Sequence, residues 1–182
     1  MDLFGAFQAY LVYSLVLLFK CTYAVTPAIS QAMFNLQEIA RVTCRQGLAC
    51  TTEQTDVAYP QWEAWHLVEA KRRTLYTMYL LDDSLSIAYD FPTFISLELE
   101  ALYAPSSKEL WQANRTDWEQ TYESHCYQWG TNGLRVGNLW PVPPNTKEDN
   151  VQEMEEARVQ WLMDADEYGM MLFAVTSSTN ES

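Results

Sequence analysis

The sequence is poor in positive charge. Its 182 residues include 11 Lys and Arg against 24 Asp and Glu, which gives a formal net charge of −13. Proteins that bind nucleic acid draw much of their affinity from clustered basic side chains, and the one such cluster here is Lys71-Arg72-Arg73. The composition therefore argues against direct contact between this chain and DNA.

Cysteine and histidine are also scarce. The cysteines are Cys21, Cys44, Cys50 and Cys126. They form no C-x-x-C pair, and their spacing fits no structural zinc site. The two histidines, His66 and His125, lie far apart in the sequence. We therefore expect reduced thiols, no metal site and no cofactor in this chain.

Apolar residues are plentiful by contrast. Hydrophobic residues make up 48% of the chain and aromatic residues 14%, which is enough apolar surface to offset the entropy of an ordered chain. The length suits one domain or part of one. Acidic residues are concentrated after Pro144. This part contains nine Asp and Glu residues and two basic residues, Lys147 and Arg158, so its net charge is −7. We expect this end to repel DNA.

The first 20 residues contain a long apolar run. No charge occurs from Leu3 to Phe19, so a membrane span or a signal peptide has to be considered. The flanks argue against both, because the early charge is Asp2 and because polar residues interrupt the run. Thr22 and Ala24 would suit a cleavage site, which keeps a secreted or membrane-anchored protein as the alternative. We expect a helix buried in a soluble core, with no membrane.

Apolar spacing predicts an all-α, multi-helix array. Apolar residues recur every three or four positions through residues 4–18 and again through residues 29–40. This spacing indicates two helices, each packed through one face. Pro27 suits the first turn of the second helix, and Gly47 suits its end. A third helix is expected from Trp62 to about Leu85, because this stretch has neither Gly nor Pro.

The later part of the chain gives weaker signals. Ser106-Ser107 followed by Glu109 predicts a helix start, after which Trp111, Arg115, Trp118 and Tyr122 share one helical face. Residues 130–150 are rich in Gly, Pro and Asn, which is typical of a loop or linker. We expect a helical regulatory core over residues 1–129, an acidic amphipathic helix over 151–175 and a polar tail over 176–182.

One charged motif stands out within the third helix. Glu69 lies one helical turn before Arg72 and Arg73, in the favourable acid-first order, and aromatic residues surround these positions in the sequence. Removing one partner of a buried ion pair typically costs about 3–5 kcal/mol. We therefore interpret Glu69 and the two arginines as a pair that pins the core, rather than as a catalytic acid or a DNA contact.

This motif resembles the signature of the fungal-specific transcription factor domain, the middle homology region of fungal zinc-cluster and C2H2 activators. That signature is E-x-x-R-R, then aromatic residues, an Asp, a Ser four residues on and a Pro ten residues after the Asp. The matching residues are Glu69, Arg72, Arg73, Tyr76, Tyr79, Asp82, Ser86 and Pro92.

The similarity extends to both sides of the motif. Ala40-Arg41 with Gly47-Leu48 resembles one segment of the family, and Leu110-Trp111-Gln112-Ala113 followed by Trp118 resembles another. Residues 4–18 resemble the helix that precedes them. The chain departs from the family pattern at Asp90-Phe91, and it contains no zinc cluster or zinc finger.

The resemblance implies a regulatory role without reaction chemistry. It implies control of RNA polymerase II transcription in the nucleus, through contacts within the protein, with a second copy or with coregulators. DNA binding, and the zinc that it needs, would come from a module outside this chain, which looks like a truncated member of the family.

A small helical enzyme of the prenyl-diphosphate type is a further alternative. Asp82-Asp83 could hold Mg²⁺, but position 86 is Ser and no second acidic cluster of the expected kind follows. His66 and Glu69 form an H-x-x-E pair that lacks the second histidine of a zinc peptidase. We therefore expect no enzyme.

Overall fold

The computed structural model describes residues 2–20, 27–45, 47, 60–89, 99–130, 133–142 and 146–178. Within these residues there are seven α-helices, one 3-10 helix, a β-bridge between Tyr103 and Arg135, and no strand. The prediction of an all-α fold is confirmed. The chain forms two compact units, Met1–Leu48 with Ala70–Ile95, and Ala49–Glu69 with Ser96–Ser182.

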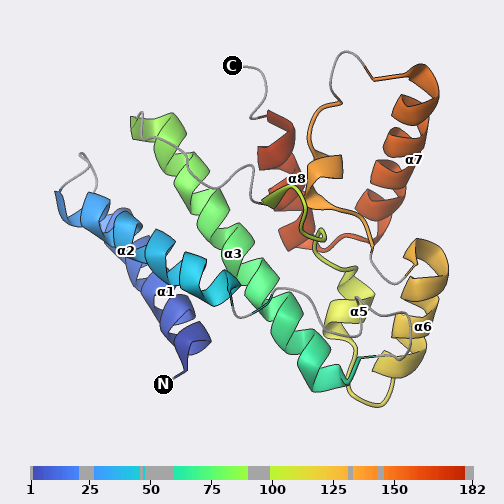
Figure 1. Ribbon diagram of the computed structural model, residues 1–182, viewed down its shortest axis with the longest axis horizontal. Coiled ribbons are helices and arrows are strands. Elements are labelled where there is room, and N and C mark those ends of the chain that lie inside the picture. Colours follow the sequence, from blue (N-terminus) through green and yellow to red (C-terminus); the bar gives the residue numbers. More distant parts are fainter. Residues whose placement is uncertain are drawn as a thin grey trace. The chain divides into compact units, whose positions relative to one another are not determined.

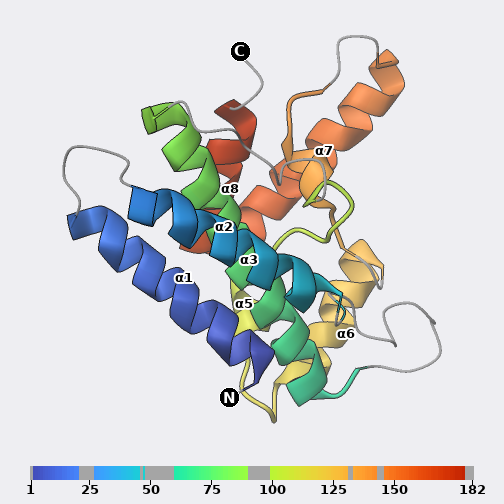
Figure 2. The ribbon, with the colours of Figure 1, turned by 60° about the vertical axis from the view of Figure 1, so that its left-hand side comes forward.

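The first unit begins with a helical hairpin. Helices α1 (Leu3–Lys20) and α2 (Pro27–Cys44) lie side by side and antiparallel (Figures 1 and 2). As predicted, α2 starts at Pro27, whose missing N–H costs nothing in a first turn. Beyond its end, Gly47 has a φ of 96° and donates its N–H to the Cys44 carbonyl. This left-handed conformation favours glycine.

Helix α3 (Trp62–Tyr89) is long and largely buried. It confirms the predicted third helix and continues four residues past the predicted end. Residues Trp62–Glu69 belong to the second unit, and the remainder of α3 belongs to the first. Thr74 and Thr77 donate their hydroxyls to carbonyls one turn back, which satisfies these polar groups inside the helix.

The second unit contains α5 (Lys108–Gln112) and α6 (Trp118–Trp129). The predicted start is confirmed, because Ser107 caps α5 by accepting the Leu110 N–H at 3.2 Å. The prediction that one helical face carries Trp111 through Tyr122 is wrong. Asn114 Oδ1 instead accepts the N–H groups of Thr116 and Asp117, and this Asx-type turn separates the two helices.

A similar capping residue divides the last predicted helix. The single helix expected over residues 151–175 is α7 (Glu148–Asp164) followed by α8 (Glu167–Ser178). Asp166 Oδ1 accepts the Gly169 N–H at 2.7 Å, and Ala165 is extended. Because an Asp before an acidic first turn is a strong helix start, the break has a signal in the sequence.

The segment predicted as a loop or linker contributes to the core. Its described part includes the 3-10 helix η2 (Val136–Leu139), in which Val136 and Leu139 are fully buried. The Ala104 N–H bonds to Leu134 O at 2.7 Å, and the Val136 N–H bonds to Leu102 O at 2.8 Å. These backbone bonds hold the segment against residues 99–104.

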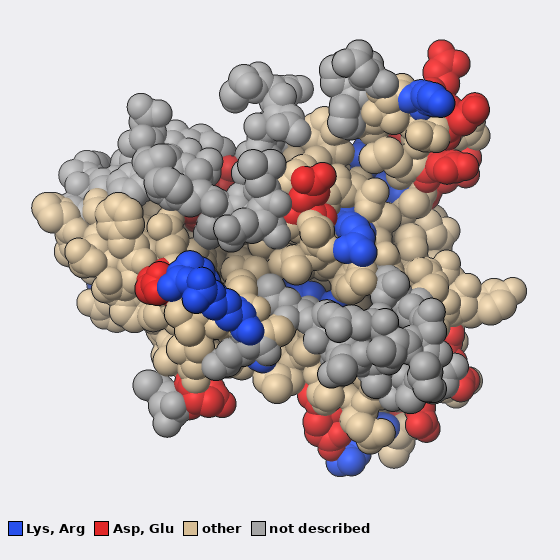
Figure 3. Space-filling model, in the orientation of Figure 1, with Lys and Arg blue, Asp and Glu red and all other residues tan. Residues whose placement is uncertain are grey.

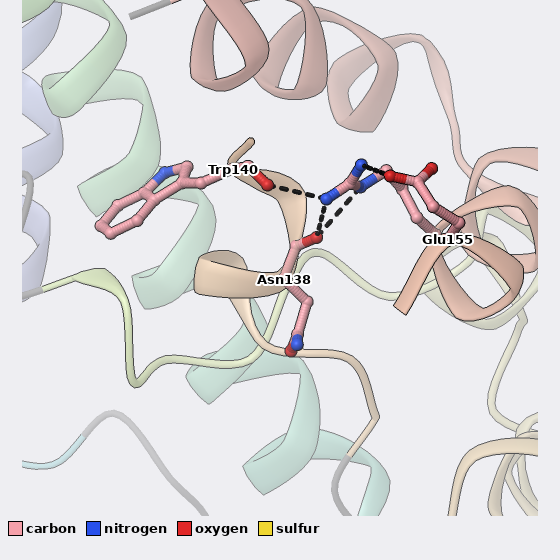
Figure 4. Close-up of polar contacts among 4 residues, drawn as sticks. Asn138, Trp140 and Glu155 are labelled. Atoms are coloured by element: carbon pink, nitrogen blue, oxygen red, sulfur yellow. Dashed lines mark hydrogen bonds and ion pairs between the residues drawn. The ribbon is translucent and has the colours of Figure 1, made fainter. Parts of the chain in front are cut away.

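Arg158 of α7 also holds this segment (Figure 4). Its Nε and Nη2 donate to Asn138 O at 3.1 and 3.0 Å, and Nη2 also donates to Trp140 O at 2.7 Å. Nη1 pairs with Glu155 at 2.6 Å. The guanidinium thus satisfies two carbonyls at the end of η2, where helix ends leave backbone acceptors without partners.

Candidate functional site

The charged residues of the sequence motif lie on α3 and are withdrawn from solvent. Glu69 is fully buried, Arg72, Asp82 and Asp83 are buried, and Arg73 is half-buried. A buried ionised group needs partners, because leaving it without them costs several kcal/mol. The partners of each group therefore indicate what the motif does.

Glu69 is tied to the segment that precedes α5. The backbone N–H and the hydroxyl of Ser106 both donate to Glu69 Oε1, each at 3.1 Å. Hydrogen bonds to an ionised acceptor are stronger than neutral ones. Ser106 is itself buried, so this pair joins two parts of the second unit that lie 37 residues apart.

The sequence does not reveal this role of Ser106. Its spacing predicts that Ser106 and Ser107 together start a helix, whereas only Ser107 caps α5. The bonds from Ser106 to Glu69 depend on tertiary packing, for which no local spacing rule exists. The predicted pairing of Glu69 with Arg72 and Arg73 stays a prediction, although all three lie within about one turn of α3.

The aromatic and acidic residues later in the motif are placed in the first unit. Tyr76 and Tyr79 are buried. On one side of them along α3, Gln8 of α1 donates to Thr74 Oγ1 at 3.3 Å. On the other side, Gln37 of α2 donates to Asp82 Oδ1 at 3.4 Å. The two rings therefore lie on the stretch of α3 that both helices of the hairpin contact through amide side chains.

Two motif residues lie outside this description. Pro92 is outside the described residues, and the side chain of Ser86 is too, although its backbone belongs to α3.

Asp83 has a shifted ionisation equilibrium. Burial raises the pKa of the Asp83 carboxyl above its ordinary value of 3.8, because a low-dielectric environment disfavours the charged form. Asp82 and Asp83 are both buried. Among the residues that the structure describes, no three His, Cys, Asp or Glu side chains come together as a metal site.

The structure brings the two tryptophans of the downstream segment to the start of α3. Trp118 of α6 packs against Trp65, with ring centroids 5.7 Å apart, and stacks on Tyr122 at 4.8 Å. Trp111 is partly buried against the same cluster. The cluster also includes Val68 and Leu110, so it joins α3, α5 and α6 within the second unit.

His66 lies among these aromatic rings. Its ring stacks on Trp111 at 5.4 Å and lies 4.4 Å from the Trp62 ring. Its Nδ1 is 3.0 Å from Trp62 O, and its Nε2 is 3.3 Å from Trp111 O. Because a neutral imidazole has one N–H, it donates to one of these oxygens at a time. His66 therefore bonds to the backbone within this aromatic cluster.

A polar cleft of about 660 Å³ lies between α5, α6 and the end of α7. Its lining includes Glu109, Asp117, His125 and Asp164. Gln128, which also lines it, donates to Asp164 at 2.9 Å. The lining is acidic and amide-rich, which makes it unsuited to phosphate groups.

Comparisons with protein-family models, with curated proteins and with solved structures find no match to this chain. The resemblance to the fungal transcription factor domain therefore rests on the motif residues themselves.

Proposed function

We propose that this chain is the regulatory region of a fungal transcription factor and that it controls RNA polymerase II transcription through contacts with other proteins. The observation that supports this most is the burial of Glu69, whose Oε1 accepts two hydrogen bonds from Ser106. A carboxylate held in this way stabilises the fold. Its side chain is withdrawn from solvent.

The arginines of the motif support the same proposal. Arg72 is buried and Arg73 is half-buried, so neither presents an open basic surface of the kind that binds phosphates. Acidic side chains gather over α7 at the upper right of Figure 3, where the helix carries Glu148, Asp149, Glu153, Glu155 and Glu156. In the proposal, a zinc module outside this chain supplies DNA binding.

A reporter experiment in yeast tests this role. The full chain is fused to an unrelated DNA-binding module, and expression of a reporter with that module's target site is measured. We expect expression to change relative to the module alone, and we expect the fusion to be nuclear. Unchanged expression from a fusion that is folded and nuclear would overturn the proposal.

A matched variant controls for general surface effects. Glu63 pairs with Arg115 at 2.8 Å, and both side chains are exposed. Glu63→Gln should leave the reporter effect unchanged, since exposed pairs contribute little to stability. Glu69→Ala, on the same helix, should reduce the effect together with the amount of folded chain.

The alternative is a secreted or membrane-anchored helical protein, and one observation favours it. Helix α1 is long and apolar enough to cross a membrane by length and composition, and 17% of it is buried. Imaging of the tagged chain separates the two functions. Nuclear signal supports regulation, whereas secretion or recovery in the membrane fraction supports the alternative.

A further inference from the structure

Helix α1 presents an apolar face to solvent. This outward face consists of Ala9, Val12, Tyr13, Val16 and Phe19, all of which are exposed. The four larger side chains are between 47% and 86% exposed, with Phe19 the most. The opposite side of α1 carries the buried residues Phe7, Leu11 and Ser14. The helix is therefore apolar on both sides while only one side is covered.

Helix α2 of the same hairpin has a different outer surface. On its exposed side Gln31 donates to Asn35, which in turn donates to Tyr10 Oη of α1, both at 2.9 Å. Further along, Arg41 pairs with Glu38. This side of α2 is mostly polar, as is usual for a helix at a protein surface, although Phe34 on it is 55% exposed. The wholly apolar outer face of α1 therefore marks an interaction site.

The spacing of the outward face suits a second helix. Ala9 and Val16 are seven residues apart, as are Val12 and Phe19, and the two pairs alternate at intervals of three and four. This is the pattern of the seam between two helices in a coiled coil. The 18 residues of α1 span about 27 Å.

Charge and side-chain size make this face complementary to itself. Asp2 lies just before α1 and Lys20 ends it, both exposed, with no charge between them. In an antiparallel pair each Asp2 meets the other copy's Lys20. The same arrangement brings the small residues Gly5 and Ala9 of one copy towards the larger Val16 and Val12 of the other, whereas a parallel pair would oppose like charges.

We propose that α1 pairs antiparallel with α1 of a second copy of this chain. The pairing does not depend on the proposed role in transcription. Because one helix pair forms a small interface, we expect reversible dimers in the micromolar range.

A lipid bilayer fits the folded hairpin less well than a second copy does. Asn35 bonds to Tyr10, and Glu38 and Arg41 follow on the exposed side of α2. Charged side chains are costly in the hydrocarbon region. To span a membrane, α1 would therefore have to leave α2 and also give up the bond from Gln8 to Thr74.

Sedimentation over a range of concentrations tests the pairing. The wild-type chain should dimerise, and Val12→Asp with Val16→Asp should raise the dimer Kd at least about tenfold. Both side chains are exposed, so circular dichroism should show an unchanged fold. Phe34→Asp is the matched control, because Phe34 is an exposed aromatic residue of α2 outside the proposed seam and should leave the Kd unchanged.

A charge variant tests the antiparallel direction. Lys20→Asp places Asp opposite Asp2 and should weaken the dimer about two- to fivefold. Adding Asp2→Asn removes the repulsion and should restore most of the affinity. The asparagine side-chain oxygen can still accept the Gly5 N–H, which Asp2 Oδ1 accepts at 2.6 Å in the wild type. A monomer at every concentration, equal weakening by Phe34→Asp, or capture of the wild-type chain by phosphatidylcholine vesicles would each overturn the proposal.

Discussion

Ser106 places both of its hydrogen-bond donors on one oxygen of Glu69, at 3.1 Å each. The two residues come from α3 and from the segment before α5, and both are buried. The most distinctive carboxylate of the sequence motif therefore acts as a structural link within the second unit.

Arg158 and Arg41 form pairs of the same type in different environments. Each pairs with a Glu three residues earlier, but Arg158 is buried and also bonds to Asn138 O and Trp140 O. Arg158→Met should lower the free energy of unfolding by about 2–4 kcal/mol. Urea denaturation should show no comparable change for Arg41→Met, and equal losses would contradict this account.

Gly137 leaves no room for a side chain. A Cβ at this position would lie 2.5 Å from Glu100 Cγ and 3.1 Å from Glu100 O. Gly137→Ala should destabilise the chain by about 1–3 kcal/mol, measured by urea denaturation. Adding Glu100→Ala removes the nearer atom and should recover part of the loss. Full stability of Gly137→Ala alone would show that η2 sits elsewhere.

Elements with local sequence signals are predicted better than contacts between distant residues. Helices α2 and α3 carry local signals, namely Pro27, Gly47 and an uninterrupted stretch after Trp62, and are predicted with nearly correct bounds. The carbonyls that Arg158 satisfies lie 18 and 20 residues away in the sequence. No periodicity encodes such a contact, so composition alone predicts a loop or linker for that segment.

The helix breaks escape prediction for a different reason. Asn114 and Asp166 interrupt stretches whose apolar spacing is otherwise helical, and each accepts backbone N–H groups from residues just after it. Their capping preference is present in the sequence, but the apolar spacing around them is the more conspicuous signal. The link between Glu69 and Ser106 has no local signal, because it joins residues 37 positions apart.

Asp83 should make stability depend on pH. Its folded pKa is raised above 3.8 by burial, so the folded chain binds this proton more tightly than the unfolded chain. The stabilisation is fully present below pH 3.8 and is lost as pH rises through the folded pKa. Asp83→Asn should therefore raise the urea midpoint at pH 7 and change it less near about pH 3.5.

An exposed acid provides the control for this pH dependence. Glu153 lies on the exposed side of α7, and Glu153→Gln should produce no such difference between the two pH values. A lower urea midpoint for Asp83→Asn at pH 7 would mean that the folded chain favours the charged carboxylate.

Two buried tryptophans should respond differently to loss of the indole N–H. Trp161 Nε1 donates to Pro105 O at 2.9 Å, whereas Trp118 Nε1 has no acceptor among the described residues. Trp161→Phe should cost about 1 kcal/mol more than Trp118→Phe, as measured by urea denaturation. Equal costs would indicate that ring packing alone decides both.

The central claim, that Glu69 acts as a structural link through Ser106, is tested most directly by a double-mutant cycle. The free energy of unfolding is measured for the wild type, Glu69→Gln, Ser106→Ala and the double variant. We predict a coupling energy of about 1–2 kcal/mol between the two sites. Additive losses, with no coupling beyond experimental error, would contradict the account.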